Sequence, residues 1–133
     1  ALLHEMGHLA DDVDPTPLAE ATREYLASCL PTGEFRAWIG EDEGQVIACS
    51  GLLFFRKPPA ARNASGLEAY VLNMYTEPGW RGRGVATALL RECIEFVKTT
   101  AARQIRLHAT ADGRPIYLRA GFADVSSEMV LRL

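Results

Sequence analysis

The sequence predicts an α/β fold in which helices flank a sheet, and three observations indicate this. Its 133 residues have the usual length of one domain, so a single domain over residues 1–133 is expected. Residues 67–76 are apolar at almost every position, which is typical of a strand buried on both faces. Residues 85–99 place apolar side chains on one helical stripe and charged side chains opposite. A turn rich in glycine and arginine joins this strand to this helix.

Two helices are expected before the sheet. Residues 2–9 carry a short apolar stripe at helical spacing. Residues 15–17, Pro-Thr-Pro, predict the start of a longer helix with Thr16 as its N-cap. The apolar stripe of that second helix ends at residues 31–33, a Pro-Thr-Gly run.

The middle of the chain predicts a hairpin followed by a loop. Residues 35–39 alternate and residues 45–55 are nearly all apolar, with an acidic turn that ends in Gly44 between them. Residues 56–66 contain two adjacent prolines and an Asn-Ala-Ser-Gly run, which predicts a loop before the strand at residues 67–76.

The C-terminal part predicts a strand, a short helix and a final strand. The two strands are expected at residues 104–109 and 128–133. Asp112 is the candidate N-cap of the helix between them. Gly121 is expected to end this helix in a left-handed conformation, which returns Phe122 to the core.

The composition restricts the class of protein. The net charge is −3, and the arginines are dispersed without interleaved aromatic residues, so no nucleic-acid partner is expected. No apolar run is long enough to cross a membrane and no secretory signal pattern is present, so no membrane partner is expected. The three cysteines, Cys29, Cys49 and Cys93, lie in separate apolar segments. Their placement favours buried thiols and a cytoplasmic location over a disulfide framework.

The glycine and arginine turn has the chemistry of a pyrophosphate site. A helix begins with unpaired backbone N–H groups and a partial positive charge, and both favour an anion. Gly82 and Gly84 would let an anion approach the backbone, while Arg81 and Arg83 add forked donors. A Walker loop is excluded because no glycine here precedes a lysine. A dinucleotide fingerprint is excluded because Thr87 stands where its third glycine belongs.

Residues 81–86, Arg-Gly-Arg-Gly-Val-Ala, resemble the Arg/Gln-x-x-Gly-x-Gly/Ala signature of the GCN5-related N-acetyltransferases (the GNAT family), which binds the pyrophosphate of acetyl-CoA. The run Pro-Gly-Trp at residues 78–80 extends the match, and residues 117–122 are similar to a second family motif, Tyr-x-x-x-Gly-Phe. The resemblance implies the fold of the family, a mixed, mostly antiparallel sheet flanked by helices. The first strand of the family has no counterpart before the helix at residues 2–9. Either the sheet lacks this strand or the sequence is truncated before Ala1.

The resemblance also implies which residues hold acetyl-CoA. Main-chain groups at the end of the central strand, from Met74, Tyr75 and Thr76, would bind the pantetheine arm. The pyrophosphate would be held by the turn and the first residues of the helix, which are Arg81, Gly82, Arg83, Gly84, Val85, Ala86 and Thr87.

Acetyl transfer to an amine also needs an acid and a base. Tyr117 resembles the tyrosine of the family that protonates the departing thiolate. An alkyl amine with a pKa of about 10.4 is mostly protonated at neutral pH, so a base should assist. Glu68 and Glu77 are candidate bases and Asn73 is a candidate positioning group, whereas His108 is expected to be structural.

The sequence thus predicts an N-acetyltransferase that moves the acetyl group of acetyl-CoA to a primary amine by direct transfer in a ternary complex. A non-catalytic acyl-CoA-binding sensor is the alternative. A zinc hydrolase is a third reading, because His4, Glu5 and His8 form a His-Glu-x-x-His motif. Gly7 weakens the helix that would hold this motif and no third ligand follows at a metzincin spacing, so no metal is expected. The acceptor amine is left open, as is whether the chain forms a homodimer.

Overall fold

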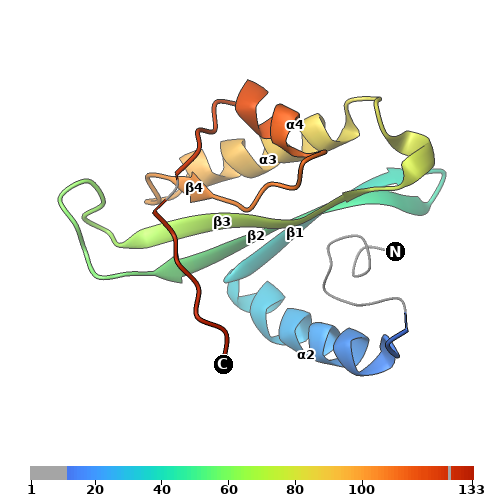
Figure 1. Cartoon of the computed structure of the whole chain (residues 1–133), viewed down its shortest axis with the longest axis horizontal. Helices are drawn as coiled ribbons and strands as arrows, with labels where there is room; N and C mark the ends of the chain where they lie inside the picture. The colour runs from blue at the N-terminus through green and yellow to red at the C-terminus, as the bar shows by residue number, and fades with distance from the viewer. Residues whose placement is uncertain (1–11, 126) are drawn as a thin grey trace.

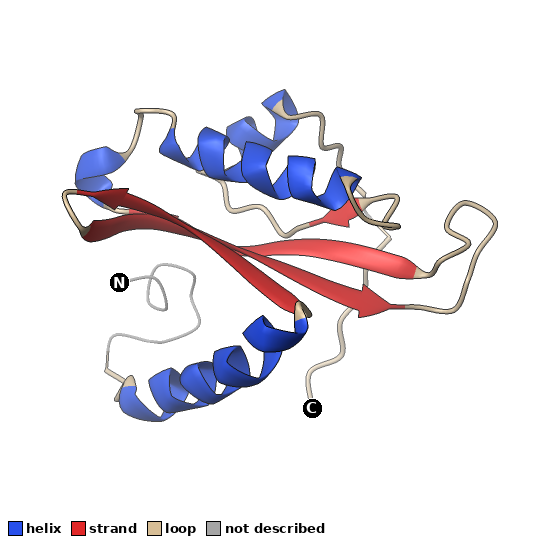
Figure 2. Ribbon diagram, turned by 180° about the vertical axis from the view of Figure 1, so that it is seen from behind, coloured by secondary structure: helices blue, strands red, loops and turns tan. Residues whose placement is uncertain are grey.

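The sheet of the computed structural model has four strands in the order β1-β2-β3-β4, with helices on both of its faces (Figures 1 and 2). The structure describes residues 12–125 and 127–133. The strands are β1 (Phe35–Asp42), β2 (Gln45–Arg56), β3 (Leu67–Thr76) and β4 (Ile105–Arg106). The pairs β1–β2 and β2–β3 are antiparallel, whereas β3–β4 is parallel. The sheet is therefore mixed and mostly antiparallel, which confirms the predicted fold class.

The helices are divided between the two faces of the sheet. They are α2 (Thr16–Thr32), α3 (Val85–Lys98), α4 (Arg114–Arg119) and the short 3₁₀ helix η1 (Pro78–Trp80). The view in Figure 1 places α2 on one face and both α3 and α4 on the other. Within residues 12–125 and 127–133, no helix combines the length and the apolar character that crossing a bilayer requires. The helix expected at residues 2–9, and with it the His4, Glu5 and His8 motif, lies outside the described residues.

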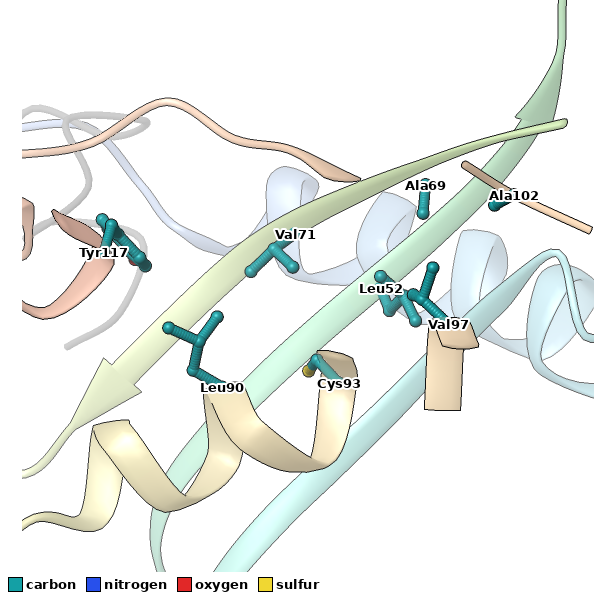
Figure 3. Packing of buried hydrophobic residues seen from close by; sticks show 8 residues of the cluster. All are labelled: Leu52, Ala69, Val71, Leu90, Cys93, Val97, Ala102 and Tyr117. Atoms are coloured by element: carbon teal, nitrogen blue, oxygen red, sulfur yellow. The ribbon is translucent and has the colours of Figure 1, made fainter. Parts of the chain in front are cut away.

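The core lies between α3 and the two central strands (Figure 3). The apolar stripe of α3 buries its side chains against alternate residues of β2 and β3. The members are Leu52, Ala69, Val71, Leu90, Cys93 and Val97, joined by Ala102 and Tyr117. Because successive side chains of a strand point to opposite faces, Tyr70, which lies between Ala69 and Val71, points away from α3.

The start of α2 differs from the prediction. Thr16 is the first helical residue, and Pro15 occupies the N-cap position without a side-chain cap. The backbone N–H of Thr16 donates to Oδ1 of Asp14 at 3.0 Å. The expected N-cap at Thr16 is wrong, because Thr16 is already helical and its own N–H is accepted by the carboxylate of Asp14. The helix ends at Thr32, within the predicted Pro-Thr-Gly run, and Gly33 after it is left-handed with φ of 75°.

The predicted hairpin is confirmed, and its turn is tight. Glu43 and Gly44 have φ values of 47° and 81°. Two consecutive left-handed residues are typical of the turns whose twist matches that of antiparallel strands.

The parallel pair β3–β4 separates after a short contact. It consists of two residue pairs, Ala69 with Ile105 and Tyr70 with Arg106. The strand expected at residues 104–109 therefore spans only two residues, because the chain after Arg106 turns away from β3 toward α4 (Figure 1). From Val71 to Thr76, β3 continues without β4 beside it.

The start of α4 also corrects the prediction. Oγ1 of Thr110 accepts the N–H of Gly113 at 3.2 Å, and the carbonyl of Thr110 accepts the N–H of Arg114 at 3.0 Å. Gly113, not Asp112, occupies the N-cap position. The prediction of Asp112 is wrong by one position, because the helix begins one residue later than expected and Thr110 accepts the N–H groups of Gly113 and Arg114.

The end of α4 is as predicted, but the final strand is not. Gly121 is left-handed with φ of 98°, and the N–H of Phe122 bonds to the carbonyl of Tyr117 at 3.0 Å. The expected strand at residues 128–133 is wrong, since the described residues 127–133 form no strand. Met129 there is 94% exposed. With only two residues, β4 offers too short an edge for another strand to pair with.

Candidate active site

A pocket of about 590 Å³ lies where the end of β3, the turn before α3 and the start of α4 meet. Three segments that are distant in sequence form its wall. The lining residues are Met74, Tyr75, Thr76, Trp80, Arg81, Gly82, Gly84, Val85, Ala86, Thr87, Thr110, Asp112, Gly113, Ile116, Tyr117 and Arg119. Nine of the ten residues predicted to bind the cofactor line this pocket together with Tyr117; Arg83 does not.

The glycines of the turn leave the backbone open on the pocket side. Gly82 and Gly84 have φ values of 71° and 80°, a conformation that other residues adopt at a cost. A Cβ added at either position would meet no atom within 4 Å. Gly84 is also the N-cap of α3 and provides no side-chain cap, so the first N–H groups of the helix are not satisfied by a capping side chain. Open backbone beside helix N–H groups suits a phosphate.

The two arginines of the turn have different roles. Nε of Arg81 donates to the carbonyl of Thr76 at 2.8 Å, which ties the turn to the end of β3. The guanidinium of Arg83 instead stacks on the ring of Trp80, 4.9 Å from its centroid. Trp80 lines the pocket, so the stacked guanidinium of Arg83 supports a residue of its wall.

The end of β3 presents unusual backbone to the pocket. Asn73 has a positive φ of 52°, and the register between β2 and β3 shifts between Cys49 and Gly51. This is a β-bulge, which bends the strand at the point where β4 has already left it. Beyond the bulge, the hydroxyl Oγ1 of Thr76 is buried without a hydrogen-bond partner among the described residues. A buried polar atom of this kind at a pocket wall is suited to a ligand.

Tyr117 closes the pocket from α4. It is 9% exposed, and its ring packs edge-on against Phe122 with 5.9 Å between centroids. A Cβ on Gly113 would lie 3.1 Å from the ring of Tyr117, so a glycine allows this close approach. Burial, and secondarily the neighbouring thiol of Cys93, raises the pKa of Tyr117. The phenol therefore stays protonated and can act as a donor toward the pocket.

The candidate bases lie outside the pocket lining. Glu68 is 5% exposed, and its carboxylate accepts a hydrogen bond from Gln104 at 2.7 Å and lies 3.7 Å from the guanidinium of Arg106. Glu77 accepts a bond from the hydroxyl of Tyr75 at 3.4 Å. The third candidate, Asn73, forms the bulge and uses its carbonyl to accept the thiol of Cys49 at 3.3 Å. These three residues are not gathered with Tyr117.

Several lining residues were missed by sequence reasoning. Thr110, Gly113, Ile116 and Arg119 reach the pocket because α4 packs across the mouth opened by the separation of β3 and β4. The motif that begins at Tyr117 carried a partial signal for these residues. A residue one helical turn before Tyr117 lies on the same face of the helix and therefore faces the same pocket. Among the described residues, no group of three or more acidic, histidine or cysteine side chains could hold a metal.

Comparison with known proteins places the chain in a family. The model of the acetyltransferase (GNAT) family matches residues 3–122. The chain is 27% identical over 116 residues to rat N-acetyltransferase 8F1, covering 75% of this chain and 50% of that protein. It is 32% identical over 81 residues to rat N-acetyltransferase family 8 member 2, covering 61% of this chain and 32% of that protein. The chain thus spans half, or less, of the length of these relatives.

Solved structures share the architecture. A predicted acetyltransferase from Clostridium acetobutylicum, solved with acetyl-CoA, is 34% identical with a TM-score of 0.84, over 94% of this chain and 79% of that one. A GCN5-related N-acetyltransferase from Ralstonia eutropha JMP134 is 28% identical with a TM-score of 0.79, over 92% of this chain and 82% of that one. The family match covers both the glycine and arginine turn and the segment of Tyr117. The chain therefore belongs to the acetyltransferase (GNAT) family.

Proposed function

We propose that this chain is an N-acetyltransferase that moves the acetyl group of acetyl-CoA to a primary amine by direct transfer in a ternary complex. The observation that carries the proposal is the pocket of about 590 Å³, which gathers an anion-binding turn, the free end of a strand and a buried phenol. Each of these parts answers one requirement of acyl transfer from a thioester.

The turn and the strand would hold the cofactor. The pyrophosphate would lie against the backbone of Gly82 and Gly84 at the start of α3, where the helix favours negative charge. The pantetheine arm would run along Met74–Thr76, where backbone groups of β3 have no neighbouring β4 strand. An extended ligand satisfies such groups in the way that an added strand would.

Tyr117 would assist the departure of the thiolate. Transfer breaks the bond between the acetyl carbon and the sulfur, and negative charge develops on the sulfur. A phenol whose pKa is raised by burial keeps its proton to high pH, so it can donate a hydrogen bond to that sulfur and then the proton itself. Its position in the pocket wall supports this role.

The proton of the amine needs a separate acceptor. Glu68 and Glu77 remain the candidate bases and Asn73 the candidate positioning group. The carboxylate of Glu68 already accepts a hydrogen bond from Gln104, so transfer of the amine proton to Glu68 would compete with that hydrogen bond.

The test combines binding and turnover. Titration calorimetry should detect CoA binding to the wild-type chain, and release of free thiol from acetyl-CoA should depend on an added primary amine. Tight CoA binding with no turnover on a broad amine panel would favour the alternative of an acyl-CoA sensor. Metal analysis of the purified protein tests the zinc hydrolase reading directly, because that reading requires stoichiometric zinc at His4 and His8.

A further inference from the structure

A second group of polar side chains connects three segments on the sheet face opposite α3. The hydroxyl of Tyr70, on β3, is hydrogen-bonded to Nδ1 of His108, which follows β4. Nε2 of the same imidazole lies 3.0 Å from Oε2 of Glu128 in the C-terminal segment. In Figures 1 and 2 this segment passes the edge of the sheet and continues on the side of α2. None of the three residues lines the pocket that holds Tyr117.

One tautomer of His108 satisfies both of its contacts. A carboxylate accepts hydrogen bonds, so in this tautomer Nε2 carries the proton and donates it to Glu128. Nδ1 is then an acceptor, and the hydroxyl of Tyr70 is its donor. The phenol oxygen keeps lone pairs that can accept a further hydrogen bond. The three groups follow the order of a catalytic triad, in which a nucleophile or acid–base residue contacts a histidine and a carboxylate orients that histidine.

The group lies at the point where β3 and β4 part. The last pair of the ladder is Tyr70 with Arg106, so the opening between the strands begins beside Tyr70. Ala69 and Val71 face the core under α3, whereas Tyr70 faces the other side. Thr110, two residues after His108, already lines the cofactor pocket. Residues 108–110 therefore connect this group with the wall of the cofactor pocket.

The neighbouring charges leave Glu128 as the carboxylate that acts on His108. Glu68 and Arg106 point to the same sheet face, one from each strand. Nε of Arg106 lies 3.7 Å from Oε2 of Glu68, so these two charges compensate each other. Among the described residues, His108 forms an ion pair with Glu128.

We propose that Tyr70, coupled to His108, removes the proton from the acceptor amine. This inference rests on the proposed N-acetyltransferase function. The protonated amine first gives an N–H proton to the phenol oxygen while the proton of Tyr70 passes to Nδ1 of His108, and the neutral nitrogen then attacks the acetyl carbon. Glu128 is a positioning residue that stabilises the resulting imidazolium. The carbon–sulfur bond breaks, the sulfur takes the proton of Tyr117, and the nitrogen releases its surplus proton to solvent. His108 then loses its extra proton to solvent, and Tyr117 regains one from solvent.

The test compares variants of the group with a matched control. Tyr70→Phe removes the hydroxyl, His108→Gln keeps a polar side chain that cannot carry charge, and Glu128→Gln removes the orienting charge. Asp124→Asn is the control, because Asp124 is a carboxylate in the same C-terminal region that pairs with Arg114 and, like Glu128, has 65% of its side chain exposed. Thiol release is measured with the best primary alkyl amine of a panel and, separately, with hydroxylamine, which is uncharged at pH 8.

The expected result separates proton removal from folding and from cofactor binding. Tyr70→Phe and His108→Gln should lower kcat with the alkyl amine by about 10²-fold or more, the usual range for lost acid–base assistance. The rate with hydroxylamine, the affinity for CoA and the thermal midpoint should stay near those of the wild type. Asp124→Asn should match the wild type in every assay.

Three outcomes would overturn the inference. Wild-type kcat with the alkyl amine in Tyr70→Phe and His108→Gln would show that the group is structural. Loss of kcat with the alkyl amine in Glu68→Gln, with His108→Gln at the wild-type rate, would assign the proton to Glu68. A nitrogen NMR spectrum with the proton of His108 on Nδ1 would contradict the tautomer on which the relay depends. If the wild-type chain binds CoA but no amine releases thiol, the proposed function itself has failed, and the relay with it.

Discussion

Replacing Gly84 by alanine should weaken CoA binding far more than it weakens the fold. Gly84 has φ of 80° and starts α3 at the wall of the pocket. A left-handed alanine costs roughly 1–2 kcal/mol, and the stiffer unfolded chain returns about 0.4–1 kcal/mol. The net loss of stability is then about 1 kcal/mol, or about 3–5 °C in the thermal midpoint for a chain of this size.

The effect on binding is expected to be larger because the new methyl group would stand where the pyrophosphate approaches. The loss of one charge-assisted hydrogen bond costs about 1.5–3 kcal/mol, so the Kd for CoA should rise about 10- to 100-fold. Gly44→Ala is a matched control, because Gly44 has φ of 81° and equally open space around its Cβ position but lies in the remote hairpin turn.

Both variants should lose similar stability in thermal denaturation, whereas only Gly84→Ala should lose affinity in titration calorimetry. Equal CoA affinity in the two variants would refute the assignment of the turn as the pyrophosphate site.

Three further predictions concern the acid, the core and the response to alkaline pH. Tyr117→Phe should lower kcat by about 10²-fold or more in thiol-release assays, while the Kd for CoA in calorimetry stays within a few-fold of the wild-type value. A change confined to Kd would show that Tyr117 takes no part in the chemistry. Leu52→Ala should lower the free energy of unfolding by about 2–5 kcal/mol in urea denaturation, because Leu52 is fully buried between β2 and α3; a loss below about 1 kcal/mol would contradict the assigned core. Burial raises the pKa of Cys93 and of Tyr117, so the native state keeps protons that the unfolded chain has lost. The contribution of these two groups to stability should therefore be constant below about pH 8.5 and decrease at higher pH as the unfolded thiol and then the phenol ionise. Stability that rises above about pH 8.5 in urea titrations would show the opposite shift.

The central strand, the turn and α3 could be predicted because their signals are local and repeated. Ten residues of β3 are nearly all apolar, and α3 keeps one apolar stripe over fourteen residues. Each of these patterns is supported by many side chains, so a single exception such as Asn73 does not hide it. The glycine and arginine turn carries its chemistry in the residues themselves, which allowed the pocket wall to be predicted before the fold was known.

The cap residues and the short elements could not be predicted in the same way. Thr16 and Asp112 are good N-cap types, yet Asp14 and Thr110 make the hydrogen bonds at the helix starts. A difference of one or two residues in where the backbone enters a helix decides which side chain reaches the free N–H. The two-residue length of β4 depends on where it leaves β3, and residues 104–109 contain no signal for that point.

The sequence by itself determined the class of fold, the order of the central elements and the glycine and arginine chemistry of the turn, because these depend on periodicity and on residue types over short stretches. Only the tertiary structure decided which distant groups meet. The separation of β3 from β4 creates the opening, brings α4 and Tyr117 over it and sets Tyr70 beside His108 and Glu128. Tyr70 and His108 are 38 residues apart in the sequence, and His108 and Glu128 are 20 residues apart. Their contacts depend on how the sheet twists and where its strands diverge, and no local pattern in the chain encodes that geometry.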